Sequence, residues 1–291
     1  MDGLDRVQWA SLHGTYDSAE SIPGQIVALR SPDPAVRGDA LGELGNAVVH
    51  QGTRWQVSAH VVPFLVRLID DRDTPSRPDL VTLLRQIGLG PRNDRDLPFD
   101  PEAVFRRQRV TEQQEAMVID RVYYREDDFD EDWVDIADAC AQKWEADAYW
   151  ATAQHADAYR RWLPDDPEVA SPAAELLAWI PPTAPTVAAL LSADTGDAVR
   201  ASANLALAHL NVPPAAVVSR MTSLLDHPAL VVRVTAAIAL ANRVGPDLPG
   251  EALDILIDAK EREVLPDFPR GWHQRAQRGF VALSLQRLGL G

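Results

Sequence analysis

The first chemically dense stretch of the chain places an imidazole, an amide, a hydroxyl and an indole close together in His50, Gln51, Thr53 and Trp55. These groups donate and accept hydrogen bonds in several directions, so the stretch can hold a small ligand or a peptide carbonyl. Alternatively, it is a helix C-cap in which Gly52 takes a positive φ and His50 bonds the last carbonyls. Polar loop residues usually serve the backbone before a ligand, and the sequence leaves both interpretations open.

The second candidate is an acidic run flanked by aromatic residues. Its acids are Glu126, Asp127, Asp128, Asp130, Glu131, Asp132 and Asp135, and its aromatics are Tyr123, Tyr124, Phe129 and Trp133. The run lacks the central Gly and terminal Glu of a calcium-binding EF-hand loop, which argues against a metal site. A solvated loop is one interpretation. The other is a docking strip for a basic partner, because aromatics and charges concentrate binding energy at interfaces.

The recognisable catalytic motifs are missing. The sequence holds no nucleophile elbow, phosphate-binding loop, dinucleotide fingerprint or zinc-protease motif. No His lies three or four residues from another, and Cys140 falls on a predicted apolar helix face, where it is a core residue rather than a nucleophile. We therefore predict no catalytic residue, no metal and no cofactor. The aromatics between Trp144 and Trp179 fill a core or wall a pocket.

Composition narrows the class of partner. The 291 residues include 28 Lys and Arg against 43 Asp and Glu, giving a net charge of -15. Such a surface repels nucleic-acid phosphates and anionic lipid. The single Cys140 cannot form an intramolecular disulfide, which favours a reducing compartment, and no leader peptide or long apolar run is visible. We expect a cytoplasmic protein with no membrane contact, for which nucleic acid is an unlikely partner; its oligomeric state stays open.

The elements that position these groups follow a helical period of apolar residues. Val199, Ala203 and Leu207 return as Val232, Ala236 and Leu240 at a shift of 33 positions, the signature of stacked helix hairpins. Residues 1–21 carry Trp9, Leu12 and Tyr16 at helical spacing and are expected to cap the array. The other predicted helices cover 22–29, 35–49, 57–69, 79–87, 112–123, about 131–153, 155–162, 169–180, 183–193, 198–210, 215–225, 230–244, 251–264 and 271–288. No strand is predicted.

The repeats resemble the HEAT and HEAT-like families. The resemblance rests on Asp194 before Val199-Arg200 and on Asp226 before Val232-Arg233, each followed by Ala and Leu at repeat spacing. It implies an all-α, HEAT-like α-solenoid in which the turn Asp and the helix Arg form a ladder, so that Arg37, Arg200 and Arg233 are structural. A narrower segment, from Asn46 through His50-Gln51-Gly52-Thr53 to Val62-Pro63-Phe64-Leu65, looks like one shared by bacterial HEAT-repeat proteins.

We therefore expect an N-terminal cap with HEAT-like repeats over 1–90, a helical acidic insertion over 91–163, and further HEAT-like repeats over 164–291. The leading hypothesis is a non-enzymatic scaffold or adaptor, with an immunity-type protein as one form of it, that binds a protein or peptide, especially a basic one. The alternative is a small-molecule-binding protein or an enzyme on the same scaffold, such as a lyase or DNA glycosylase. The predicted binding residues are His50, Gln51, Thr53, Trp55, Tyr123, Tyr124, Asp127, Asp128, Asp130, Glu131 and Trp133.

Overall fold

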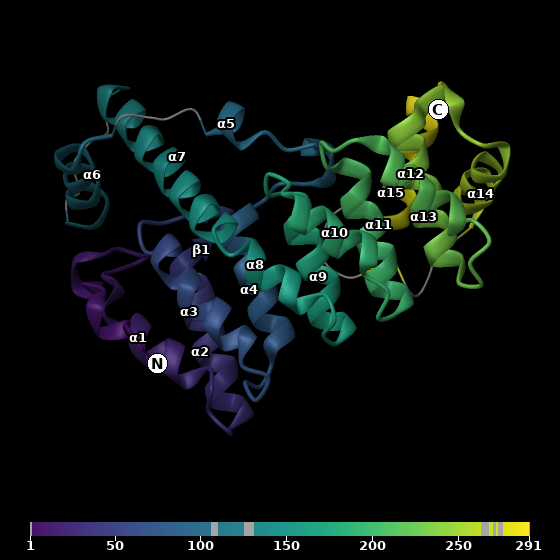
Figure 1. Cartoon of the computed structure of the whole chain (residues 1–291). Helices are drawn as coiled ribbons and strands as arrows, with labels where there is room; N and C mark the ends of the chain where they lie inside the picture. Colours follow the sequence, from purple (N-terminus) through teal and green to yellow (C-terminus); the bar gives the residue numbers. More distant parts are fainter. Residues whose placement is uncertain are drawn as a thin grey trace. The chain divides into compact units, whose positions relative to one another are not determined.

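The computed structural model describes residues 2–105, 110–124, 131–262, 268–269, 272 and 276–290, with the side chains of 131, 132 and 276–278 left aside. Helices account for nearly all regular structure in these residues, so the predicted all-α class is confirmed (Figure 1). The one departure is a short hairpin, β1 (Val49–His50) and β2 (Thr53–Arg54). Two compact units divide the chain: 1–91 with 100–155, and 92–99 with 156–291.

The first unit begins with three short 3-10 helices instead of the expected helical stripe. They are η1 (Leu4–Arg6), η2 (Trp9–Ser11) and η3 (Ala19–Ser21). Trp9 is buried and donates its indole N–H to the carbonyl of Leu4 at 2.7 Å, whereas Tyr16 is 67% exposed. A single helix would have put both rings on one face, so that part of the prediction is wrong.

The described part of the first unit has seven α-helices, six of which lie within two residues of the predicted limits and one of which, over 101–104, lies where no helix was predicted. They are α1 (Ile22–Ala28), α2 (Pro34–Val48), α3 (Ser58–Asp70), α4 (Arg77–Leu89), α5 (Pro101–Val104), α6 (Glu112–Tyr124) and α7 (Glu131–Ala153). Helix α7 packs against both α3 and α4. Gly88 makes this possible, because a Cβ there would lie 2.6 Å from atoms of Thr152 on α7. Helix α4 therefore continues through Gly88, beyond its predicted end, and is capped by Gly90, whose φ is 60.

The second unit is a stack of helix hairpins. Its helices are α8 (Ala156–Trp162), α9 (Pro167–Ala178), α10 (Ala184–Ser192), α11 (Asp197–His209), α12 (Pro214–Ser223), α13 (Leu230–Val244), α14 (Gly250–Glu261) and α15 (Ala276–Arg287), with η4 (Asp94–Asp96) and η5 (Gly245–Asp247). Helix α11 lies between α9 and α13 (Figure 1). The recurring alanines Ala173, Ala203 and Ala236 are fully buried along this stack, where small side chains let neighbouring helices approach closely.

Hydrogen bonds between repeats reinforce the stack. Ser202 donates to the carbonyl of Ser171 at 2.7 Å, and the Asn204 amide donates to the Thr235 hydroxyl at 3.2 Å. All four residues are buried, where a polar group without a partner would be costly. These bonds fix the register of α9, α11 and α13.

The three arginines implied to be structural close the turns that precede their helices. Arg37 donates to the carbonyls of Ser31 and Pro32, and Arg233 donates to those of His227 and Pro228, at the same sequence offsets. Arg200 donates to the carbonyl of Asp194 at 3.1 Å, six residues before it. Its carboxylate partner is Asp197 at 2.9 Å, in its own helix.

None of the helices within the described residues combines the length and apolar character needed to span a bilayer.

Candidate functional site

The stretch around His50 forms a tight β-hairpin. Gln51 and Gly52 occupy its turn with φ of 50 and 85, and His50 pairs with Thr53. Two successive residues with positive φ are typical of the turn whose twist matches that of paired strands. Helix α2 ends one residue earlier, where Val49 donates to the carbonyl of Gly45. Gly52 thus has the expected positive φ, but the helix C-cap interpretation is wrong.

The side chains of this hairpin do not converge. The His50 ring lies against Tyr16, with Nδ1 3.1 Å from the tyrosine oxygen. Gln51 and Thr53 are exposed, whereas Trp55 is half-buried and turns toward the aromatic residues of α6 and α7. The sequence therefore located a chemically dense stretch, but in the structure its side chains lie apart and do not form one site.

Arg54, which the sequence did not single out, anchors the hairpin. It is 2% exposed, donates to the carbonyl of Gly52 at 2.7 Å and forms an ion pair with Glu145 of α7. Its guanidinium fills the space beside Gly90, where a Cβ would collide with it. The burial of a paired arginine ties β2, α4 and α7 together. A lone Arg between two predicted binding residues gave no sequence signal of this role.

Two of the predicted binding residues, Trp55 and Tyr123, lie in one aromatic cluster. The Trp55 ring centroid lies 6.2 Å from that of Tyr123 and 6.0 Å from that of Trp144. They pack on Val118, Ile119 and Cys140. Cys140 is fully buried, as predicted, and burial, followed by the charge of Glu115, raises its pKa to about 11. The thiol is a core group with little thiolate at neutral pH.

The remaining predicted residues lie at the edge of this cluster. Tyr123 donates its hydroxyl to the carbonyl of Gly14, and burial raises its pKa above the ordinary range. The neighbouring Tyr124 is 63% exposed, with its oxygen 2.9 Å from His13 Nε2. Trp133 is 9% exposed beneath the guanidinium of Arg121. Asp127, Asp128 and Asp130 lie outside the described residues, as does the side chain of Glu131.

An acidic groove of about 320 Å³ opens beside Tyr124. It is lined by Ser11, His13, Gln56, Glu112, Glu115, Ala116, Ile119, Asp120 and Tyr124. Three carboxylates on α6 therefore face one small space whose rim carries the imidazole of His13 and the Tyr124 ring. Burial, partly offset by the charge of Asp17, lowers the pKa of His13, so its ring is neutral at pH 7 and does not cancel the acidic character.

Lys143 connects this groove with a second hollow. Its ammonium lies 3.5 Å from a carboxylate oxygen of Glu115 and 2.8 Å from one of Asp147. Burial alone would lower the pKa of Lys143, but the hydrogen bonds and charges of Asp147 and Glu115 outweigh it, and the pKa is raised. Glu115 also accepts a hydrogen bond from the Trp144 indole. One ammonium is thus shared between a carboxylate of α6 and a carboxylate of α7.

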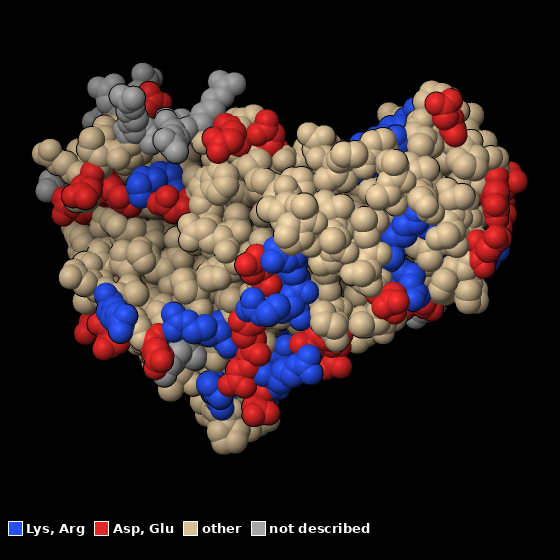
Figure 2. Space-filling model, viewed as in Figure 1, with Lys and Arg blue, Asp and Glu red and all other residues tan. Residues whose placement is uncertain are grey.

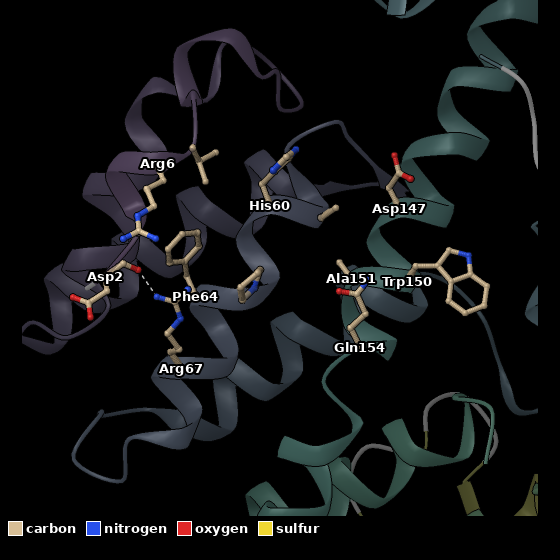
Figure 3. Close-up of a pocket in the computed structure, with 13 residues that line it drawn as sticks. Asp2, Arg6, His60, Phe64, Arg67, Asp147, Trp150, Ala151 and Gln154 are labelled. Carbon is tan, nitrogen blue, oxygen red and sulfur yellow. Dashed lines mark hydrogen bonds between the residues drawn. The ribbon is translucent and has the colours of Figure 1, made fainter. Parts of the chain in front are cut away.

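The second hollow is a cavity of about 760 Å³ between the N-terminal residues, α3 and α7. Figure 3 shows Asp2, Arg6, Phe64 and Arg67 on one side, Asp147 and Ala151 of α7 with the following Gln154 on the other, and His60 between them. Its size falls within the range typical of small-molecule sites. Of the residues that line this cavity, the sequence had singled out only Pro63 and Phe64, as part of the segment that looks like one shared by bacterial HEAT-repeat proteins and not as a site.

Surface charge does not point to a single patch. On the face drawn in Figure 2, acidic and basic side chains are mixed, and broad areas carry neither. Among the described residues, no group of three or more His, Cys, Asp or Glu side chains is placed to hold a metal ion. The local charge of the groove and of the cavity therefore decides what each can bind.

Neither a family model nor a curated protein matches this sequence. Among solved structures, the chain is similar to human deoxyhypusine hydroxylase in complex with glycerol, at 16% identity over 93% of this chain and 96% of that chain, with a TM-score of 0.29. It is also similar to an engineered protein, at 19% identity over 93% of this chain and 71% of that one, with a TM-score of 0.31. The chemistry of the site has to be inferred from its own residues.

Proposed function

We propose that this protein is a non-enzymatic binding scaffold whose first unit captures a basic side chain of a protein or peptide partner in the acidic groove. The observation that supports this most directly is the presence of Glu112, Glu115 and Asp120 around one space of about 320 Å³. Lys143 pairs with Glu115, and the acidic lining as a whole favours a cationic guest.

Arginine is the preferred guest because its shape fits the groups available. A guanidinium is planar and donates hydrogen bonds to carboxylates in a two-pronged geometry, which a lysine ammonium does not reproduce. It also stacks on aromatic rings, and Tyr124 offers an exposed ring at the rim. The groove thus combines charge attraction with a stacking surface for a single side chain.

The acidic run is proposed to extend this surface along the partner. Asp127, Asp128, Asp130 and Glu131 lie within seven residues after Tyr124 in the sequence. Exposed charges of this kind accelerate encounter with a basic partner more than they prolong the complex, and their effect fades with salt over a Debye length of about 10 Å at 0.1 M. Gln51 and Thr53, on the exposed hairpin turn, are proposed as further polar contacts.

The test compares two labelled peptides by fluorescence anisotropy, one with several arginines and one with citrulline in their place. Citrulline keeps the planar shape but removes the positive charge, so we expect the arginine peptide alone to bind. Replacing Glu112→Gln together with Asp120→Asn should weaken its binding by about tenfold, or about 1.4 kcal/mol. Equal binding of the two peptides would refute the proposal.

A matched control removes the same number of charges elsewhere. Glu251 and Asp254 are exposed on α14 of the second unit. The Glu251→Gln, Asp254→Asn protein should bind the arginine peptide as the wild type does. If it loses as much affinity as the groove variant, net charge alone drives binding, and the groove is not the site.

A further inference from the structure

The larger cavity is lined by two arginines that are not paired with a carboxylate of the described residues. Arg6 and Arg67 both line it, and neither forms an ion pair with any part of the chain that the structure describes. Arg67 donates one hydrogen bond to the backbone carbonyl of Asp2, and its guanidinium carbon lies 5.0 Å from the centre of the Phe64 ring. The contact with the Phe64 ring orients the guanidinium, and its other N–H groups can donate hydrogen bonds to a ligand.

The acids of the cavity do not offset both arginines. Asp2 and Asp147 are its acidic lining residues, and Asp147 is already paired with Lys143 at 2.8 Å. Two guanidinium groups therefore face one carboxylate that is not committed to a salt bridge. The chain as a whole has 43 acidic residues against 28 basic ones, so this local excess of positive charge is opposite in sign to the net charge of the protein. The cavity consequently attracts an anion.

His60 adds hydrogen bonding without adding charge. Its ring borders the cavity, and partial burial lowers its pKa, with the charge of Asp147 acting in the opposite direction. At pH 7 the imidazole is neutral, so one ring nitrogen donates and the other accepts. Gln154 contributes an amide on the opposite wall (Figure 3). The polar part of a ligand thus finds donors on both sides.

The remaining lining is apolar. Val7, Ala59, Pro63, Phe64 and Ala151 border the same space. A cavity of about 760 Å³ is larger than an inorganic ion needs and suits an organic molecule. The wall therefore combines an apolar patch, which can hold the body of a ligand, with charged and polar groups that fix its orientation.

We propose that this cavity binds a small organic anion, a carboxylate on an apolar body. The carboxylate lies between Arg6 and Arg67, where the guanidinium geometry matches its two oxygens. The apolar body packs against Phe64 and Pro63. This site is separate from the acidic groove and opposite to it in charge, so the proposal does not depend on the capture of a basic side chain.

The test uses isothermal titration calorimetry with benzoate as the probe and benzamide as its uncharged counterpart. Benzoate should bind saturably, and benzamide should bind at least about tenfold more weakly, because only the carboxylate engages both arginines. Phenyl phosphate and inorganic phosphate separate a general anion site from a carboxylate site. Tighter binding of inorganic phosphate than of benzoate would overturn the assignment to an organic carboxylate.

Variants place the binding in the cavity. Arg6→Gln and Arg67→Gln should each weaken benzoate binding by about tenfold, and Arg67→Lys should restore part of the loss because it keeps the charge without the fork. The control is Arg30→Gln, which removes an exposed arginine of the same unit that pairs with Asp71. Arg6 makes no contact that folding depends on in the described residues, so its variant remains informative if Arg67→Gln fails to fold. Unchanged benzoate binding in Arg6→Gln, or no saturable binding of any anion, would refute the site.

Discussion

Protonation of a buried histidine should make the second unit sensitive to mild acid. His209 ends α11, is 7% exposed and packs on Phe280 with ring centroids 6.0 Å apart. Its Nε2 is buried and has no hydrogen-bond partner among the described residues. Burial, followed by the charges of Arg287 and Arg243, lowers its pKa from 6.5 to about 3. In the folded protein the His209 imidazole is therefore neutral at pH 7, and its surroundings disfavour the protonated form.

The sign and size of the effect follow from this difference. The unfolded chain takes up the proton near pH 6.5, well before the folded one does, so the stabilisation is complete above pH 6.5 and is lost as pH falls toward 3. The full difference corresponds to about 5 kcal/mol at about 1.4 kcal/mol per pKa unit. Between pH 7 and pH 5 the expected loss is about 2 kcal/mol.

Hydrogen exchange of the α11 and α13 amides, read by mass spectrometry at pH 7 and pH 5, measures this loss in the second unit alone. His209→Leu removes the titrating group, so its loss of stability between the two pH values should be about 2 kcal/mol smaller than that of the wild type. Only the difference between pH values matters, which cancels any direct cost of the substitution. His50→Gln in the first unit is the control. An identical pH dependence in wild type and His209→Leu would refute the reasoning.

Two further predictions concern Arg54, which anchors the hairpin. Gly90→Ala should destabilise the first unit by at least about 2 kcal/mol, because a φ of 60 disfavours a side chain and the new Cβ would collide with the Arg54 guanidinium. Urea unfolding measures this loss, and Gly24→Ala, where a Cβ would meet nothing within 4 Å, is the control. Arg54→Met should cost about 3 kcal/mol by removing the buried guanidinium from its ion pair with Glu145, and adding Glu145→Gln should recover part of this; no recovery would contradict the ion-pair explanation.

The sequence predicted the helices well because the repeats bury one face of each helix. Helix α13 begins and ends at the predicted residues, Leu230 and Val244. The hairpin was missed because strands of two residues are too short to show alternation, although Gln51-Gly52 is compatible with a turn. The 3-10 helices near Trp9 were missed for a related reason, since their apolar residues happen to follow a helical spacing.

The sites were largely beyond the sequence because they join distant segments. The groove brings His13 and Gln56 to α6, and the cavity brings Arg6 to Arg67 and Gln154. A single sequence contains no signal that these positions meet. Tyr124, which lines the groove, was singled out because aromatics beside an acidic run are conspicuous in composition, whereas isolated arginines are not.

The charge of Lys143 should affect ligand affinity at the two sites in opposite directions. Its ammonium pairs with Glu115 of the acidic groove and with Asp147 of the cavity. Lys143→Gln would free both carboxylates, so the groove should bind an arginine peptide more tightly while the cavity binds benzoate more weakly. Each change should be at most about tenfold, because the ammonium is a third exposed and solvent screens the pairs. Anisotropy and calorimetry on the same variant measure the two affinities. A shift of both in the same direction would indicate a general loss of structure and would contradict the shared-charge explanation, since only the removal of a common counter-ion moves them apart.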